Sequence, residues 1–153
     1  MKIRHVNDSR IISVIIGILA SLMIILPVLV LKDSETSYTG LQVAFGYEFT
    51  NLGSWASGEI AFNPLVLLAF VLPLAGTFML ILSNRGYLLS TIMFAAAAIL
   101  IFMIPEFTKV TVTVLGNVNE IDVEWTYGLG LIIAASLSIM ATLLGLFKLS
   151  RNA

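Results

Sequence analysis

Cysteine is absent from the sequence, and histidine occurs once, as His5 near the N-terminus. The lack of cysteine excludes disulfides, thiolate metal sites and cysteine nucleophiles. Charged residues make up only 11% of the chain, whereas about 25% is usual in soluble globular proteins. So few charges do not cover a water-soluble surface, and we therefore expect lipid to solvate most of the chain. A net charge of −1 gives no electrostatic basis for binding nucleic acid.

The common catalytic motifs are missing as well. The sequence has no Walker A, HExxH or GxSxG pattern, and His5 has no catalytic partner near it in the sequence. No ionisable side chain lies within the long apolar segments, although proton- and ion-coupled transporters generally place one there. We therefore expect a protein that is not an enzyme and that binds no cofactor.

Four apolar segments contain no Asp, Glu, Lys, Arg or His: residues 11–31, 63–83, 87–104 and 127–147. A helix needs roughly 20 residues to cross the hydrocarbon of a bilayer, and it satisfies its own backbone hydrogen bonds there. The connection 83–86 is short enough to force the second and third segments into an antiparallel hairpin. The sequence thus predicts a mainly α membrane protein, built as an antiparallel bundle of four transmembrane helices.

The orientation follows from the basic residues. Six of the eight lie in the N-terminal segment, the 83–86 connection and the C-terminal segment, whereas eight of the nine acidic residues lie in the two longer connections. Basic residues collect on the cytoplasmic side. We therefore expect both termini in the cytoplasm of a multi-pass cell-membrane protein. Exported regions without cysteine are typical of bacterial envelope proteins, which favours a bacterial plasma membrane.

The two longer connections, residues 32–62 and 105–126, show alternating patterns. Large apolar residues occupy the odd positions of Leu41–Phe49, and apolar and polar residues alternate on both sides of a predicted turn at 116–119. We expect these strands to form one small antiparallel extracytoplasmic β-sheet, with Tyr47 and Phe49 buried or shielded by lipid. Residues 51–59 read as an irregular connection around Trp55.

Small residues recur at helical spacing in the first and fourth segments, where they let helix backbones approach closely. They mark either packing inside the bundle, which we favour, or an interface with a partner. A second feature is Pro73, followed by Gly76: it indicates either a hinge lining a substrate path or a static kink, and we favour the kink. The predicted interface residues are Gly17, Ser21, Gly130, Ala134, Ser138 and Ala141.

Glu120, Asp122 and Glu124 form the one acidic row in the sequence. Clustered oxygens of this kind suit a divalent cation, but one flat strand face does not converge on an ion. We favour a solvated strand face and expect no metal site.

The layout of four spans, with strands in both outer connections, resembles claudin-like proteins. The claudin signature of tryptophans with a cysteine pair is absent, since Trp55 is alone in the first connection. The run Thr39–Gly46 is similar to uncharacterised small four-span membrane proteins of Gram-positive bacteria. This resemblance implies an architecture and no activity.

The leading functional hypothesis is a non-enzymatic integral membrane protein that acts by association, as an accessory subunit or envelope scaffold. Besides the lipid bilayer, its partner would be another membrane protein or a second copy of the chain. The alternative is a channel or transport component that forms a pore as an oligomer. Polar residues around a water-filled cavity would favour the alternative, and a dry, packed bundle would favour association.

Overall fold

A computed structural model describes residues 2–83 and 85–152, with side chains placed over residues 8–83 and 85–151. The side chain of His5 therefore lies outside the described part. Within that part the chain is mostly helical, with six α-helices and seven short strands.

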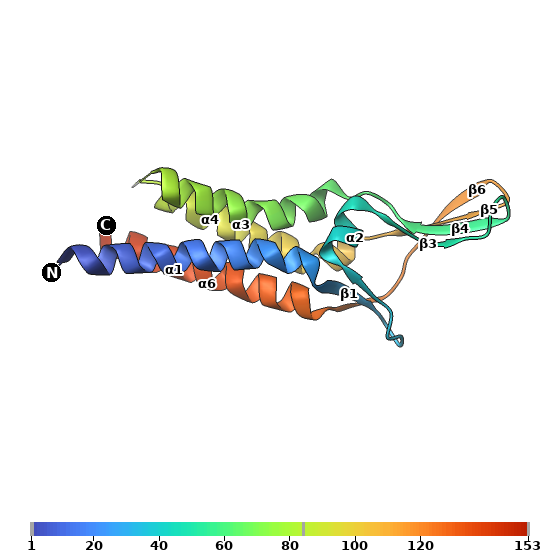
Figure 1. The fold of residues 1–153 in the computed structure, drawn as a ribbon, viewed down its shortest axis with the longest axis horizontal. Coiled ribbons are helices and arrows are strands. Elements are labelled where there is room, and N and C mark those ends of the chain that lie inside the picture. Colours follow the sequence, from blue (N-terminus) through green and yellow to red (C-terminus); the bar gives the residue numbers. More distant parts are fainter. Residues whose placement is uncertain (1, 84, 153) are drawn as a thin grey trace.

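Four long helices lie alongside one another: α1 (Lys2–Leu22), α3 (Pro64–Leu82), α4 (Tyr87–Phe102) and α6 (Leu129–Asn152) (Figure 1). Helix α1 contacts α3 and α6, and α4 contacts the same two, so each helix has two long neighbours. Among the described residues, three helices are long and apolar enough to cross a membrane, over Asp8–Ile25, Pro64–Leu82 and Leu129–Arg151. Helix α4 is also apolar but has 16 residues.

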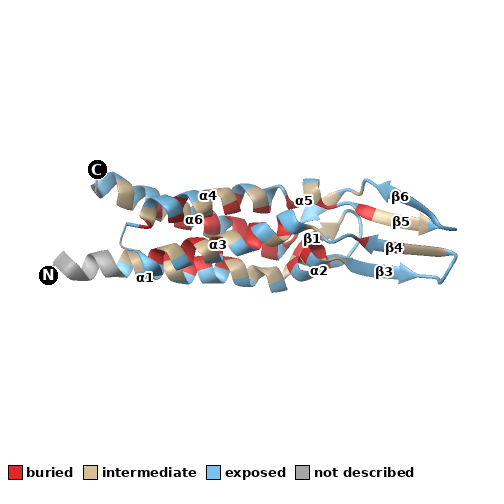
Figure 2. Ribbon diagram, turned by 90° about the horizontal axis from the view of Figure 1, so that it is seen from above, coloured by how far each residue is buried: buried red, intermediate tan, exposed pale blue. Residues whose placement is uncertain are grey.

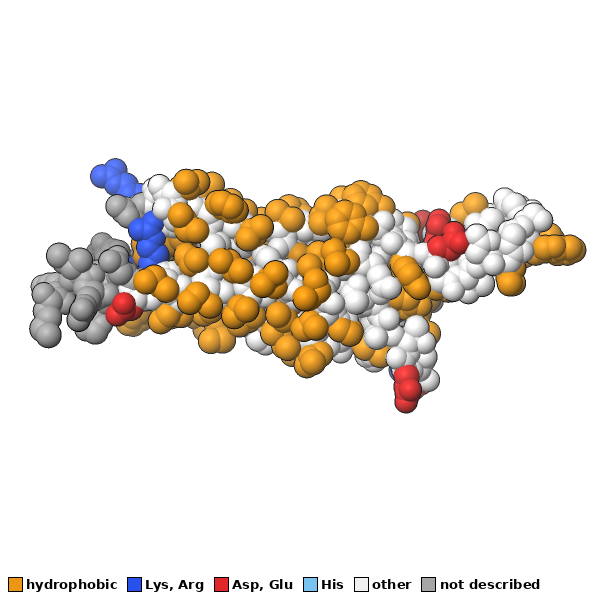
Figure 3. All heavy atoms as spheres, in the orientation of Figure 1, with side chains coloured by type: hydrophobic (Ala, Val, Ile, Leu, Met, Phe, Trp, Pro, Cys, Tyr) orange, Lys and Arg blue, Asp and Glu red, His pale blue; other side chains and the backbone are white. Residues whose placement is uncertain are grey.

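The two ends of this helical body differ in charge. Both termini and the connection between α3 and α4 lie at one end, and the strands lie at the other (Figure 1). Lys and Arg side chains gather at the end with the termini, whereas most of the visible acidic side chains lie at the strand end (Figure 3). The two termini and the α3–α4 connection, which the basic residues predict to lie on the same side of a membrane, are therefore at the same end of the structure.

The prediction of a helix over the whole of residues 11–31 is wrong at its C-terminal end. Helix α1 ends at Leu22, a short 3-10 helix (η1) covers Met23–Ile25, and strand β1 covers Pro27–Leu31. Proline has no N–H and moves the residue before it out of the helical region, and Leu26 is indeed extended, with φ −93° and ψ 160°. Apolar composition alone did not distinguish this buried strand from a continuing helix.

The prediction of one extracytoplasmic sheet is also wrong, because there are two antiparallel sheets among the described residues. The three-stranded sheet has the order β2 (Ser37–Thr39), β1, β7 (Trp125–Tyr127). The four-stranded sheet has the order β3 (Tyr47–Asn51), β4 (Ala56–Ile60), β5 (Val110–Val114), β6 (Asn117–Ile121). Strand β6 ends at Ile121, and the chain then leaves this sheet to pair with β1.

Strand β4 replaces the predicted irregular connection over 51–59. Its Ala56 and Gly58 are weak strand formers, so the residue types in this segment do not favour a strand. Pairing with β3 on one side and β5 on the other holds it in place. The second hairpin is present as predicted, but its turn is at Leu115–Gly116 rather than at 116–119.

Residues 41–45, predicted as part of a strand, form a short helix, α2 (Gly40–Phe45). A capping box starts it: the Gln42 N–H donates to Thr39 Oγ1 at 3.3 Å, and the Thr39 N–H donates to Gln42 Oε1 at 2.9 Å. Gly46, with φ +90°, ends it. Tyr47 and Phe49 follow in β3 and are 41% and 39% exposed, so other parts of the protein do not bury them, because the sheet extends beyond the helices (Figure 2).

Two apolar clusters fill the helical body. One lies towards the strand end and includes Phe70, Ile101, Leu131 and Ala134. The other lies nearer the termini and consists of Ile16, Leu80, Phe94 and Ala141. Buried positions therefore follow the inward faces of the helices, whereas the four-stranded sheet is largely exposed (Figure 2).

Candidate association surfaces

Gly17 brings α1 close to α3. A β-carbon added at Gly17 would overlap the hydroxyl of Thr77 and would lie 3.0 Å from the ring of Phe94. The Thr77 hydroxyl donates to the carbonyl of Pro73 at 2.9 Å, which fixes its rotamer against the helix. The side chain at this contact therefore has little freedom to make room.

Phe94 occupies the space between these helices. Its side chain is 1% exposed, and it lies against Gly17 of α1 and Gly76 of α3. Gly76, a predicted hinge residue with Pro73, is thus part of a close helix contact. Helix α3 runs unbroken through Pro73, which is buried. These positions place the pair in the packed interior and not beside a described cavity.

The other predicted interface residues lie mostly in α6. Ala134, Ser138 and Ala141 are buried, and a β-carbon at Gly130 would lie 2.8 Å from Leu26 Cβ. Ser21 of α1 is half-buried. With Gly17, five of the six predicted residues are buried within a single chain.

A few hydroxyls in this interior have no hydrogen-bond partner. Among the described residues, these buried atoms are the side-chain oxygens of Ser21, Tyr87, Ser90 and Ser138. Other interior hydroxyls donate to their own helix, as Thr91 does to the carbonyl of Tyr87 at 2.6 Å. The unpaired hydroxyls come from three different helices, α1, α4 and α6, and the Lys148 ammonium lies 5.0 Å from the centroid of the Tyr87 ring.

The outward faces of the long helices carry large apolar side chains (Figure 3). Ile12 and Ile15 of α1, Phe78 of α3, and Ile132 of α6 are about half exposed or more. Between α1 and α6 lies a groove of about 380 Å³, lined by Ile12, Ile16, Met140, Leu143 and Leu144. Because every lining side chain is apolar, the groove suits hydrocarbon and not water.

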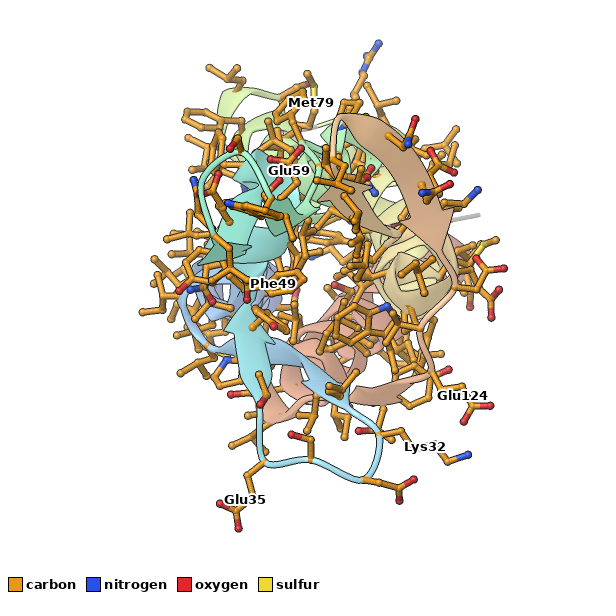
Figure 4. The ribbon with its side chains drawn as sticks, turned by 90° about the vertical axis from the view of Figure 1, so that its right-hand side faces the viewer. Lys32, Glu35, Phe49, Glu59, Met79 and Glu124 are labelled. Atoms are coloured by element: carbon orange, nitrogen blue, oxygen red, sulfur yellow. The ribbon has the colours of Figure 1, made fainter. Side chains whose placement is uncertain are left out.

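A polar cleft of about 620 Å³ opens beside helix α5 (Ile104–Phe107) and strand β7. Its charged lining residues are Lys32, Glu106, Lys109, Asp122 and Glu124. Lys32 and Glu124 form an ion pair and lie together at the edge of the strand end (Figure 4). The hydrogen bond from Lys32, together with its charge, lowers the pKa of the Glu124 carboxyl.

The acidic row predicted from the sequence does not form one strand face. Glu120 lies in β6 and pairs with Lys109 at 3.5 Å, whereas Asp122 and Glu124 lie beyond the end of that strand. In the described part of the chain, no three His, Cys, Asp or Glu side chains come together in an arrangement that could hold a metal ion.

An aromatic cluster joins the two sheets, and the sequence analysis missed it. The ring of Tyr38 in β2 lies 5.9 Å from that of Tyr47 and 6.5 Å from that of Phe49, both in β3, and 5.7 Å from that of Trp125 in β7. Burial raises the pKa of the Tyr38 hydroxyl, and the nearby Tyr47 adds to this effect. These residues are up to 87 positions apart, so no local pattern indicates that they meet.

No protein-family model matches the chain, and no curated protein or solved structure matches it.

Proposed function

We propose that this chain is an integral membrane protein with four spans that acts by association, as an accessory subunit or envelope scaffold without catalytic activity. Its termini would lie in the cytoplasm of a bacterial cell, and the two sheets would form an extracytoplasmic cap. The three long apolar helices and the collection of basic residues at the end with the termini support this proposal.

Helix α4 would be the fourth span. Its 16 residues extend about 24 Å, less than the roughly 30 Å of an average hydrocarbon core. Met103 and Ile104 follow it directly and lengthen the apolar segment. Local thinning of the bilayer accommodates a mismatch of this size at modest free energy.

The observation that favours association over transport is the filling of the helical body. Phe94, Leu80 and Ile16 occupy it near the termini, and Phe70, Ile101 and Leu131 occupy it near the strands. These side chains make the interior largely apolar, and the buried residues of the described part include no Asp, Glu, Lys, Arg or His. The groove between α1 and α6 is equally apolar, so it offers no polar wall to a pore made by several copies.

The absence of native cysteine permits a clean topology test, because a single introduced cysteine is then the only reactive thiol. In intact cells, a membrane-impermeant maleimide should label Asn117→Cys and Ser57→Cys. It should label Arg85→Cys only after the membrane is broken. Labelling of Arg85→Cys in intact cells would refute the proposed orientation.

Liposomes containing the purified protein test the second half of the proposal. They should release a trapped fluorescent anion and dissipate a proton gradient no faster than empty liposomes. A protein-dependent flux that increases with the protein-to-lipid ratio would favour the oligomeric channel instead.

A further inference from the structure

The outer end of the four-stranded sheet is apolar. Two hairpin turns meet there, and the N–H of Leu115 in one donates to the carbonyl of Trp55 in the other at 2.9 Å. This end lies opposite the termini, and Figure 3 shows exposed hydrophobic side chains at its extremity. We call the following side chains the apolar tip, with their exposed fractions: Leu52 64%, Trp55 71%, Val114 44%, Leu115 67% and Val118 65%.

The apolar tip carries no charge, although the rest of the cap is rich in acidic residues. Residues 49–58 and 110–119, which build the outer part of both hairpins, contain no Asp, Glu, Lys or Arg. Below them, Glu48, Glu59 and Glu120 lie in one row across the sheet, through the pairs Glu48–Glu59, Glu59–Thr111 and Thr111–Glu120. At about 3.3 Å per strand residue, roughly 10 Å of uncharged sheet extends beyond this acidic row.

Leu115 occupies a backbone conformation that leucine rarely adopts. Val114 pairs with Asn117, so Leu115 and Gly116 form a two-residue turn, with φ +50° and φ +82°. Turns of this kind strongly favour Asn, Asp or Gly at the first position. Leu115 is exposed and adds no core packing here, so packing within the folded chain does not explain a leucine in this turn.

The apolar tip is apolar on both faces of the sheet. Val114 lies on the face of Val110 and Val112, whereas Val118 pairs with Thr113 and lies on the opposite face. Docking on a protein surface would need only one apolar face of the tip, whereas insertion into a bilayer would surround both faces with lipid. Turn backbone groups are paired as well, since the Leu52 N–H donates to the Ala56 carbonyl at 2.8 Å. Such pairing lowers the free energy of entering an apolar medium.

We propose that the apolar tip inserts into the surface of a second lipid bilayer, opposite the one that holds the helices. The chain would then bridge two lipid surfaces, a role that rests on the proposed membrane topology. A stable dimer through the apolar tip is disfavoured, because about 800 Å² per partner is typical and the tip offers five side chains. The acidic row would sit at the headgroups, so zwitterionic lipid should be preferred over anionic lipid.

Tryptophan fluorescence tests this insertion directly. Trp125→Phe leaves Trp55 as the sole tryptophan. The variant is placed in nanodiscs of ordinary phosphatidylcholine, and vesicles of brominated phosphatidylcholine are added. We expect the Trp55 emission to shift to shorter wavelength and to be quenched. Replacing part of the vesicle lipid with brominated phosphatidylglycerol should weaken the quenching at low salt and less so at high salt.

Leu115→Asn separates insertion from folding. Asparagine fits the turn better than leucine, so thermal stability should be unchanged or higher. Vesicle binding should fall roughly tenfold or more, since burial of one leucine side chain is lost. The matched control is Thr113→Asn, which replaces one polar side chain of the same strand by another and should leave binding unchanged.

Each outcome decides the proposal. Incorporation into nanodiscs without quenching by the added vesicles overturns it and leaves the membrane topology intact. Quenching by brominated lipid placed only in the protein's own nanodisc overturns it in favour of a tip in the same bilayer. Pairing of nanodiscs that Leu115→Asn abolishes, without lipid quenching, shows a protein contact instead. Failure to enter nanodiscs refutes the membrane proposal itself. If Trp125→Phe does not fold, the difference between the natural sequence and Trp55→Phe isolates the same signal.

Discussion

The hydroxyl of Thr91 lies against the bare α-carbon of Gly145, where α4 meets α6. A β-carbon at position 145 would overlap this hydroxyl and would lie 3.0 Å from Thr91 Cβ. Gly17 and Thr77 repeat the arrangement where α1 meets α3. In both contacts the threonine donates to the carbonyl four residues earlier, so its hydroxyl is fixed. In the membrane setting proposed above, lipid would give little hydrophobic driving force between the helices, and close contacts of this kind would hold them together.

Adding a single methyl group at either contact should destabilise the protein. Gly145→Ala and Gly17→Ala should each lower the free energy of unfolding by about 1–3 kcal/mol, as overpacking does elsewhere. Thermal unfolding in one detergent measures the effect, with Ile132→Leu on an exposed face as control. In the double variant Gly145→Ala/Thr91→Ala the overlap with the hydroxyl is removed but the close contact between the two β-carbons remains, so only part of the loss should be regained. A neutral Gly145→Ala would show that the two backbones are further apart.

In the part of the helical body nearer the termini, truncation of Phe94 should lower the free energy of unfolding more than truncation of any other single side chain. Phe94→Ala removes the group that fills the space between Gly17 and Gly76. Loss of a buried phenylalanine typically lowers the free energy of unfolding by about 3–5 kcal/mol. The matched control is Phe78→Ala in α3, where the ring is 54% exposed and the loss should be small. Equal losses for the two variants would contradict the packing described.

The sequence predicted the helical body better than the cap because helical spacing is a local signal. Gly17, Ala134 and Ser138 stand out by their spacing, and all three are buried. Phe94 does not stand out, since its sequence neighbours are equally apolar. The two Gly–Thr contacts join residues 54 or more positions apart, and one sequence contains no information on such pairing.

The cap is harder to predict from the sequence because several local signals compete there. The alternation over Leu41–Phe49 favours a strand, but the capping box of Thr39 and Gln42 starts a helix that takes half of this segment. Pro27 marks the start of β1, yet it lies inside an apolar run long enough to read as one helix. The predicted position of the turn in the second hairpin is wrong because Leu115 has a positive φ, which is not expected for leucine.

The capping box can be tested on its own. Thr39→Ala removes the oxygen that accepts the Gln42 N–H, and it should lower the free energy of unfolding by about 1 kcal/mol. Thr39→Ser keeps an accepting hydroxyl and should lose little of it. Amide hydrogen exchange over residues 40–45 should increase in the first variant only. Unchanged exchange in Thr39→Ala would show that α2 is held by its contacts with α3 rather than by its cap.

The ion pair of Lys32 and Glu124 joins the chain just after β1 to the chain just before β7, beside a backbone hydrogen bond from Lys32 N to Glu124 O at 3.1 Å. Because the pair lowers the pKa of Glu124 in the folded protein, the folded state binds its proton less readily than the unfolded state. The stabilisation is therefore present above the ordinary pKa of a glutamate. It is lost as the pH falls through the lowered value. Thermal unfolding curves of the natural sequence and Glu124→Gln should differ at neutral pH and converge in acid.

High salt should reduce the same difference, since both side chains are exposed. Glu35→Gln, on the neighbouring exposed turn, is the control and should follow the natural sequence at every pH. A gap between the natural sequence and Glu124→Gln that persists in acid would show that the glutamate side chain acts through packing and not through its charge.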